Sequence, residues 1–187
     1  VEEVVSQIEK STKVTPIGIL EQAVAVANET VYDASLENVA LYGMGTTIVA
    51  AVVLGDTVYV INVGDSRLYV CKDTLKQVTV DHSLVEEMVQ SGKIQKEDMR
   101  THPNKNIITR ALGTDSMVKA DCFEIEVEEG DVLLLCSDGL TNMLEDDRIE
   151  TILKQNRDDM SRVGELLVKE ANEAGGKDNI SVVLVRI

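Results

Sequence analysis

The spacing of apolar residues near the N-terminus predicts a helix. Apolar side chains recur there at intervals of three and four, the period of one helical face: Ile17, Leu20, Val24, Ala27, Val31 and Ala34. The Thr15-Pro16 pair before them combines a good N-cap residue with a proline at the first helical position. We therefore expect an amphipathic helix that begins at Pro16.

Between residues 46 and 80 the pattern changes to short runs rich in β-branched residues. The runs are TIVAAVVL, TVYVINV, RLYVC and LKQVTV, and turn residues separate them at 55–56, 64–66 and 72–74. Short turns between such runs predict an antiparallel meander.

The second half of the chain mixes both periods. Residues 83–112 are polar and punctuated by Gly92 and Pro103, which predicts an irregular surface excursion with one short helix around 84–90. Two helical and three strand patterns follow, namely 146–154 and 158–174, and 118–127, 132–136 and 179–187. Helices at both ends with antiparallel strands between them indicate an α+β fold, since short hairpins leave no room for βαβ crossovers.

Composition and charge narrow the class of protein. A chain of 187 residues, 44% of them hydrophobic, can form one globular domain with a hydrophobic core. We therefore expect residues 1–187 to form a single domain. The net charge of -15 argues against binding nucleic acid. No apolar run approaches the roughly 20 residues of a membrane helix, and no signal peptide is recognisable, so we expect a cytoplasmic protein without membrane insertion. The cysteines fall in apolar strand-like runs, which indicates reduced core thiols: Cys71, Cys122 and Cys136.

Three aspartates stand at the ends of predicted strands. Asp138 follows an apolar run in the string Ser137-Asp138-Gly139, Asp178 precedes the last strand, and Asp65 follows the second run. A strand leaving the core fixes such a side chain well enough for a metal ligand or catalytic carboxylate, and Gly139 lets another group approach closely. The alternatives are structural: a turn or an N-cap for the next helix at Ser137-Asp138-Gly139, a glycine C-cap and turn at Asp178, and a hairpin turn at Asp65.

Convergence of these aspartates would require a counter-charge. Two carboxylates about 4 Å apart repel by roughly 4 kcal/mol at an effective dielectric constant of about 20. Without Cys or His ligands nearby in sequence, an all-oxygen site favours Mg²⁺ or Mn²⁺ over zinc. Such an ion would also attract an anionic substrate locally, which the overall field of a chain with net charge -15 does not do.

Six strings occur in order along nearly the whole chain: Met44-Gly45-Thr46-Thr47, Val63-Gly64-Asp65-Ser66-Arg67, Asp81-His82-Ser83, Asn106-Ile107-Ile108-Thr109-Arg110-Ala111-Leu112-Gly113, Leu135-Cys136-Ser137-Asp138-Gly139-Leu140 and Gly176-Lys177-Asp178-Asn179-Ile180-Ser181. Together they resemble the metal-dependent serine/threonine phosphatases of the PPM (type 2C) family in their bacterial form. The resemblance implies a four-layer αββα sandwich of two antiparallel sheets flanked by helices. It also implies hydrolysis of phosphoserine and phosphothreonine in proteins by a metal-activated water.

The same resemblance implies cofactors, partners and site residues. The family uses two catalytic Mn²⁺ or Mg²⁺ ions, with a third in bacterial members, and its partners are phosphorylated proteins and in some cases a cognate Ser/Thr kinase. Asp138 and Asp178 match ligands of the first catalytic metal, and Asp65 matches the aspartate that holds the third metal together with Asp138. Residues 83–112 match a mobile flap. The neighbours expected around the ligands are Ser137, Gly139 and Asn179.

His82 and Arg110 have open roles. His82 could support the ligands or orient the flap, although a histidine beside a turn is more often plain surface. Arg110 could anchor the flap or approach phosphate, but an ion pair with one of the many acidic side chains is favoured.

The resemblance has a gap. The family's Arg and Glu-Asp segment and its Asp-Gly-Met-Gly-Gly-His-like loop, which supply further metal ligands, a phosphate-binding arginine and the proposed general-acid histidine, occur nowhere in these 187 residues. The chain opens on Val1 within an apolar helical stripe of Val1, Val4, Val5 and Ile8. We therefore expect an incomplete phosphatase domain that is weakly active or inactive, with uncovered sheet edges that favour self-association. The competing hypothesis is a non-catalytic regulatory or binding module that retains the fold.

Overall fold

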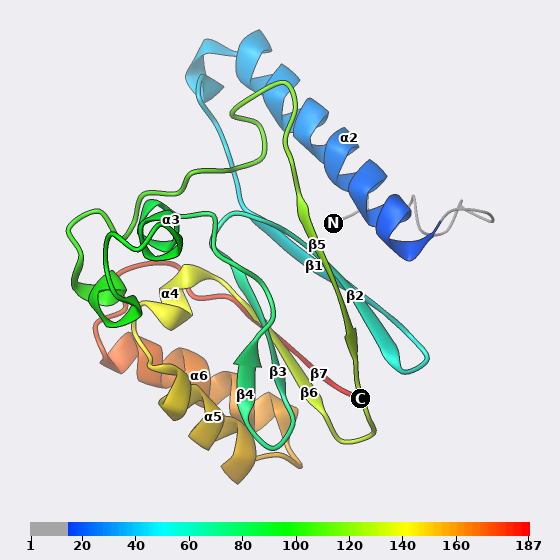
Figure 1. Ribbon diagram of the computed structural model, residues 1–187, viewed down its shortest axis with the longest axis vertical. Helices are drawn as coiled ribbons and strands as arrows, with labels where there is room; N and C mark the ends of the chain where they lie inside the picture. The colour runs from blue at the N-terminus through cyan, green and yellow to red at the C-terminus, as the bar shows by residue number, and fades with distance from the viewer. Residues whose placement is uncertain (1–14) are drawn as a thin grey trace. The chain divides into compact units, whose positions relative to one another are not determined.

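The computed structural model describes residues 15–187, in which the chain forms two compact units (Figure 1). Of the described residues, the first unit contains 15–64 together with His82–Ile125, and the second contains Asp65–Asp81 and Glu126–Ile187. The predicted apolar stripe of Val1, Val4, Val5 and Ile8 lies outside the described residues.

A long helix dominates the first unit. Helix α2 (Pro16–Glu37) begins where the Thr15 hydroxyl accepts a hydrogen bond from the Gly18 amide at 3.2 Å. This confirms the predicted start at Pro16. The middle of the apolar stripe supplies the core of this unit, in which the following side chains are buried together: Leu20, Ala23, Val24, Ile61, Val63 and Leu112.

In its described residues, the first unit also contains a three-stranded sheet and three short helices. The strands are ordered β1 (Ile48–Leu54), β2 (Thr57–Val63) and β5 (Asp121–Glu126). β1 and β2 form the predicted hairpin, because Leu54 pairs with Thr57 across a two-residue turn. The short helices are η1 (Val39–Leu41), α3 (Leu84–Gln90) and η2 (Lys96–Thr101). The bounds of α3 agree with the predicted short helix.

The second unit contains a four-stranded sheet in the order β4–β3–β6–β7. Its strands are β3 (Arg67–Cys71), β4 (Leu75–Gln77), β6 (Val132–Cys136) and β7 (Val182–Arg186). Every neighbouring pair is antiparallel, and Cys136 of β6 lies opposite Arg67 on one side and Val182 on the other. The end of β6 is thus flanked by both neighbouring strands.

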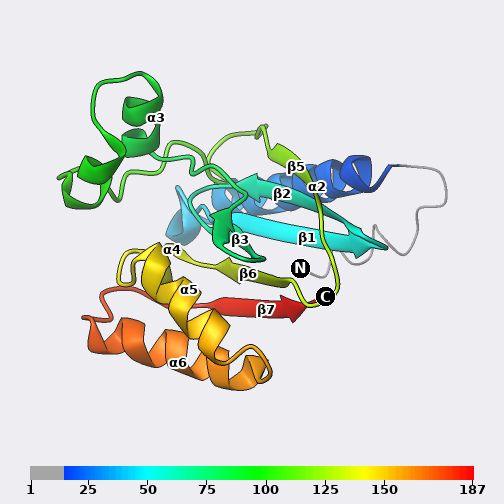
Figure 2. The same cartoon turned by 60° about the horizontal axis from the view of Figure 1, so that its bottom comes forward.

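Two helices of the second unit cover one face of its sheet. Figure 2 shows α5 (Asp146–Gln155) and α6 (Met160–Glu173) side by side along β6 and β7. The buried side chains between helices and sheet include Tyr69, Leu134, Ile149, Ile152, Leu153, Val163 and Leu167. A single-turn helix, α4 (Asp138–Thr141), directly follows β6. None of the helices in the described part of the chain combines the length and apolar character needed to cross a bilayer.

The α+β class is confirmed, with antiparallel sheets and flanking helices, but the predicted meander is wrong. β2 and β3 belong to different sheets, so residues 64–66 connect two sheets and do not form a hairpin turn. β3 pairs instead with β6, which lies some 65 residues further along the chain, Arg67 lying opposite Cys136. Local turn chemistry carries no information about such a distant partner.

Candidate metal centre

Two loops of the second unit are joined at the end of β6. The Ser137 hydroxyl donates a hydrogen bond to the Asn179 carbonyl oxygen at 2.9 Å and accepts one from the Ser181 amide at 3.0 Å. The Ser137 amide donates to the Ser181 carbonyl oxygen at 3.1 Å. The strings that contain Asp138 and Asp178, 40 residues apart in sequence, are therefore held against each other.

Glycine at position 139 is required by this junction. A β-carbon at Gly139 would overlap the Asn179 carbonyl oxygen and lie 2.9 Å from its carbonyl carbon. Real side chains do not tolerate such a contact with backbone. The close approach expected at Gly139 is thus present, and the group that approaches is the backbone carbonyl of Asn179.

The structure also tests the N-cap alternative for this loop. Ser137 occupies the N-cap position of α4, but its side chain makes no capping hydrogen bond to that helix. Its hydroxyl is already used by Asn179 and Ser181. Ser137 therefore acts as a bridge between the two loops, a role that the sequence did not predict.

Asp138 is the first residue of α4 and is half-buried. Burial and then the negative charge of Asp178 raise its pKa, while a backbone hydrogen bond from Gly139 partly offsets the shift. The Asn142 side-chain amide donates to one carboxylate oxygen of Asp138 at 2.9 Å and restricts its rotation. Asp138 is thus positioned by Gly139 and Asn142 and lies within electrostatic reach of Asp178.

Asp65 lies within reach of the same carboxylate. Burial, then the charge of Asp138, then that of Asp81 raise the pKa of Asp65 to about 6, with Arg67 acting weakly in the opposite direction. Asp138 is therefore the shared member of two acidic pairs, one with Asp65 and one with Asp178.

The donor chemistry of these pairs fits a hard divalent cation. All the side-chain donors are carboxylate oxygens, which Mg²⁺ and Mn²⁺ prefer. Burial is the main cause of the raised pKa of Asp138 and Asp65, repulsion between carboxylates adds to it, and a cation would relieve that repulsion. Across residues 15–187, however, no group of three or more His, Cys, Asp or Glu side chains is gathered closely enough to hold one ion. Each pair would thus supply two protein carboxylates to an ion.

A polar cavity of about 440 Å³ adjoins Asp178. The Asp178 side chain is exposed and accepts a hydrogen bond from the Asn179 amide at 2.7 Å. The other residues of the cavity wall are Val168, Asn172, Gly176, Lys177, Asn179 and Ile180. Solvent and small polar groups can therefore reach Asp178.

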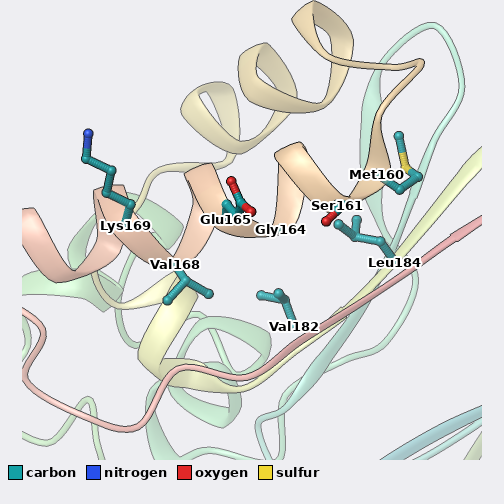
Figure 3. Close-up of a pocket in the computed structure, with 8 residues that line it drawn as sticks. All are labelled: Met160, Ser161, Gly164, Glu165, Val168, Lys169, Val182 and Leu184. Carbon is teal, nitrogen blue, oxygen red and sulfur yellow. The ribbon is translucent and has the colours of Figure 1, made fainter.

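A larger cavity of about 710 Å³ lies between α6 and β7 and has mainly apolar walls (Figure 3). Glu165 and Lys169 point away from its floor, which is formed by Val168, Val182 and Leu184. It contains none of the predicted site residues, so its size does not make it the functional centre.

A buried ion pair in the second unit was missed by the sequence reasoning. Arg67 donates to both carboxylate oxygens of Asp81 at 2.7 to 3.0 Å and to the Tyr69 hydroxyl at 2.9 Å. Tyr69 in turn donates to Asp146 at 3.1 Å. Arg67 and Asp81 both occur in the six strings quoted above, which was the available signal, but nothing local indicated that they pair.

The structure places His82 and Arg110 together in the first unit. His82 is 6% exposed, so the preference for a surface histidine was wrong. Its Nε2 lies 3.1 Å from Asp121 Oδ2, and Arg110 donates to Asp121 Oδ1 at 2.8 Å. The favoured ion pair of Arg110 with an acidic residue is thus confirmed.

Comparison with known proteins finds one matching family and several similar relatives. Residues 3–180 match the family model for protein phosphatase 2C. The serine/threonine phosphatase stp of Listeria welshimeri is 49% identical over 146 residues, which are 78% of this chain and 58% of that protein. This chain therefore spans less than two thirds of the length of that relative.

Solved structures give the same result. The serine/threonine phosphatase Stp1 of Staphylococcus aureus aligns with a TM-score of 0.92 and 35% identity over 100% of this chain and 74% of its own. The catalytic domain of the phosphatase PstP, solved in complex with two manganese ions, aligns with a TM-score of 0.85 and 29% identity, covering 98% of this chain and 78% of its own.

Proposed function

The chain belongs to the protein phosphatase 2C family, and on this premise we propose that it hydrolyses phosphoserine and phosphothreonine in proteins with the help of Mn²⁺ or Mg²⁺. The observation that supports the proposal most directly is the hydrogen-bonded junction that holds the Asp138 and Asp178 strings together, with Asp138 in electrostatic reach of both Asp65 and Asp178. A fold kept only for binding has no physical need for such mutually repelling carboxylates.

The residues of the junction have distinct roles in this proposal. Asp138 and Asp178 would hold a catalytic ion, and Asp138 and Asp65 would hold a further ion of the bacterial type. Ser137 keeps the two loops in register, and Gly139 and Asn179 provide their close contact. A bound ion of this kind lowers the pKa of a coordinated water and neutralises charge on the phosphoryl group.

The activity of this chain by itself is expected to be weak or absent. Each acidic pair would supply only two carboxylates, and no group of three or more possible ligands is gathered among the described residues, so we expect weak binding of the ion and little activity. We also propose cytoplasmic phosphoproteins as substrates, with a Ser/Thr kinase as the opposing enzyme in the pathway. Self-association would use the edge strands β4 and β7 of the second sheet.

The test is Asp138→Asn, with Asp73→Asn as the matched control. Asp73 is exposed in the turn between β3 and β4, away from the acidic pairs in sequence. Calorimetric titration with Mn²⁺ should show binding to the parent protein that is weakened at least tenfold by Asp138→Asn and unchanged by Asp73→Asn.

Turnover of a phosphothreonine peptide would favour one of the two functional hypotheses. Hydrolysis by the parent protein, even at a low rate, that is lost in Asp138→Asn supports an enzyme. Mn²⁺ binding and peptide binding without any turnover would fit both the non-catalytic module and an incomplete phosphatase domain. Unchanged Mn²⁺ affinity in Asp138→Asn would remove this residue from the centre.

A further inference from the structure

The chain passes from the first unit to the second between Gly64 and Asp65, and returns between Asp81 and His82. The two residues on the first-unit side of these crossings are hydrogen-bonded to each other. The His82 amide donates to the Gly64 carbonyl oxygen at 2.9 Å, and the Gly64 amide donates to Nδ1 of the His82 ring at 2.9 Å. One buried histidine therefore holds both backbone groups of the residue that precedes Asp65.

The backbone at Gly64 requires glycine and is held by hydrogen bonds. Its φ of +109° is a value that residues with side chains rarely adopt, and a β-carbon there would overlap the Thr47 side chain. The Asn62 side-chain amide also donates to the Gly64 carbonyl oxygen at 3.2 Å. Three hydrogen bonds thus hold Gly64, two of them at the carbonyl oxygen of the peptide that leads into Asp65.

These contacts also determine the tautomer of His82. Because Nδ1 accepts the Gly64 amide proton, the ring proton is on Nε2, which donates to Asp121 at 3.1 Å. Arg110 Nη1 lies 2.9 Å from Nε2, but both are then donors, and Asp121 is the acceptor that they share. The imidazole is held at both nitrogens.

His82 is also the point at which residues 83–112 begin and to which they return. The Thr109 amide donates to the His82 carbonyl oxygen at 2.8 Å, and the Leu84 amide donates to the Ile107 carbonyl oxygen at 2.9 Å. Ser83 and Ile108 form an antiparallel bridge between these bonds. The main chain of His82 thus closes the base of the segment while its ring holds Gly64.

We propose that His82 is a positioning residue that fixes the backbone from which Asp65 projects and ties it to the base of residues 83–112. The proposal rests on the proposed function in one respect, namely that Asp65 is a metal ligand. Residues that orient a metal ligand from behind typically change metal affinity about 10- to 100-fold when they are replaced.

Two substitutions test the hydrogen bonds at the two imidazole nitrogens separately. His82→Asn keeps an acceptor oxygen close to the position of Nδ1 and loses the contact with Asp121. His82→Gln places its amide close to the position of Nε2 and loses the acceptor for the Gly64 amide. We expect His82→Gln to weaken Mn²⁺ binding at the Asp65–Asp138 pair about tenfold, and His82→Asn to stay within about twofold of the parent protein because it restores the acceptor.

Calorimetric Mn²⁺ titration of both variants and of Asp65→Asn is the measurement. If Asp65→Asn loses the same binding step while His82→Gln keeps parent affinity, the positioning role is wrong and the proposed function stands. If Asp65→Asn itself binds Mn²⁺ like the parent protein, Asp65 is not a ligand, and this proposal fails together with that assignment.

A measurement on the unsubstituted protein removes the dependence on folding of the variants. In ¹⁵N-resolved spectra, His82 should show a protonated Nε2 and an unprotonated Nδ1, and the Gly64 amide should be slow to exchange with solvent. Titration with diamagnetic Mg²⁺ should shift the Gly64 amide resonance. A protonated Nδ1, or a Gly64 resonance that does not move while Asp138 signals do, would overturn the proposal.

Discussion

The carboxylates of this protein fall into two contrasting environments. Asp121 in the first unit is matched by donors: although burial acts to raise its pKa, hydrogen bonds from His82 and Arg110 lower it below its usual value. For Asp138 and Asp65 in the second unit, burial and then the charges of neighbouring carboxylates raise the pKa, and the donors near them do not reverse the shift. Balanced charge is typical of a residue that holds the fold, and unbalanced charge is consistent with the metal site proposed above.

The largest loss of stability is expected at the junction between the loops that carry Asp138 and Asp178. Gly139→Ala inserts a β-carbon into the Asn179 carbonyl group and should cost about 2 to 3 kcal/mol of unfolding free energy. Because the two loops would separate, Mn²⁺ affinity should fall as well. Chemical denaturation and calorimetry measure the two quantities.

Gly164→Ala is the matched control for that substitution. A β-carbon at Gly164 of α6 meets its nearest neighbour, Leu184, at 3.7 Å, an ordinary contact. Alanine is about 1 kcal/mol better than glycine inside a helix, so this variant should be as stable as the parent protein or more so. Equal losses from both variants would contradict the role of the junction.

Neutralising one carboxylate in each environment should have opposite effects on stability. Asp121→Asn removes the charge that pairs with Arg110 at 2.8 Å and should cost about 1 to 2 kcal/mol, reduced by the partial exposure of the pair. Asp138→Asn relieves repulsion and should raise the melting temperature of the metal-free protein. Melting curves in a chelator measure both, and a loss of stability in both variants would refute the comparison.

The raised pKa of Asp65 should also make the free energy of unfolding depend on pH. The pKa of Asp65 is raised to about 6 in the folded protein from 3.8 in the unfolded chain. The folded state therefore binds the proton more tightly, so this residue contributes stability below about pH 4 that is lost as the pH rises through 6. Melting temperatures between pH 4 and 7, compared with those of Asp65→Asn, should isolate this contribution, and saturating Mn²⁺ should reduce it. Identical pH profiles of the two proteins in chelator would count against it.

The smallest effect calibrates the others. Thr15→Ala removes the N-cap of α2 in the first unit, where the hydroxyl lies 3.2 Å from the Gly18 amide. It should cost about 0.5 to 1 kcal/mol and leave Mn²⁺ affinity unchanged. A fall in affinity would show that general loss of stability, and not local geometry, controls binding.

Local patterns predicted individual elements well. The strand at Val132–Cys136, the helix at Leu84–Gln90 and the helix start at Pro16 all follow from apolar period and capping residues. The assignment of β2 and β3 to one meander failed, because their partners are decided by pairing across distant parts of the chain. Strand pairing of this kind leaves no local signature.

The acidic residues of the candidate site could be predicted from the sequence, but the residues that hold them in place could not. Asp65, Asp138 and Asp178 stand out because each follows or precedes an apolar strand run. The bridge made by Ser137 and the buried position of His82 depend on which backbone lies opposite, and a polar string beside a turn looks the same whether it is covered or exposed.

The closed base of residues 83–112 has a consequence for how such proteins diversify. Because Ser83 pairs with Ile108 and the chain enters and leaves at adjacent positions, insertions or deletions within the segment leave the strands on either side in register. The length and sequence of residues 83–112 can therefore vary among related proteins without displacing the strands that carry the acidic residues.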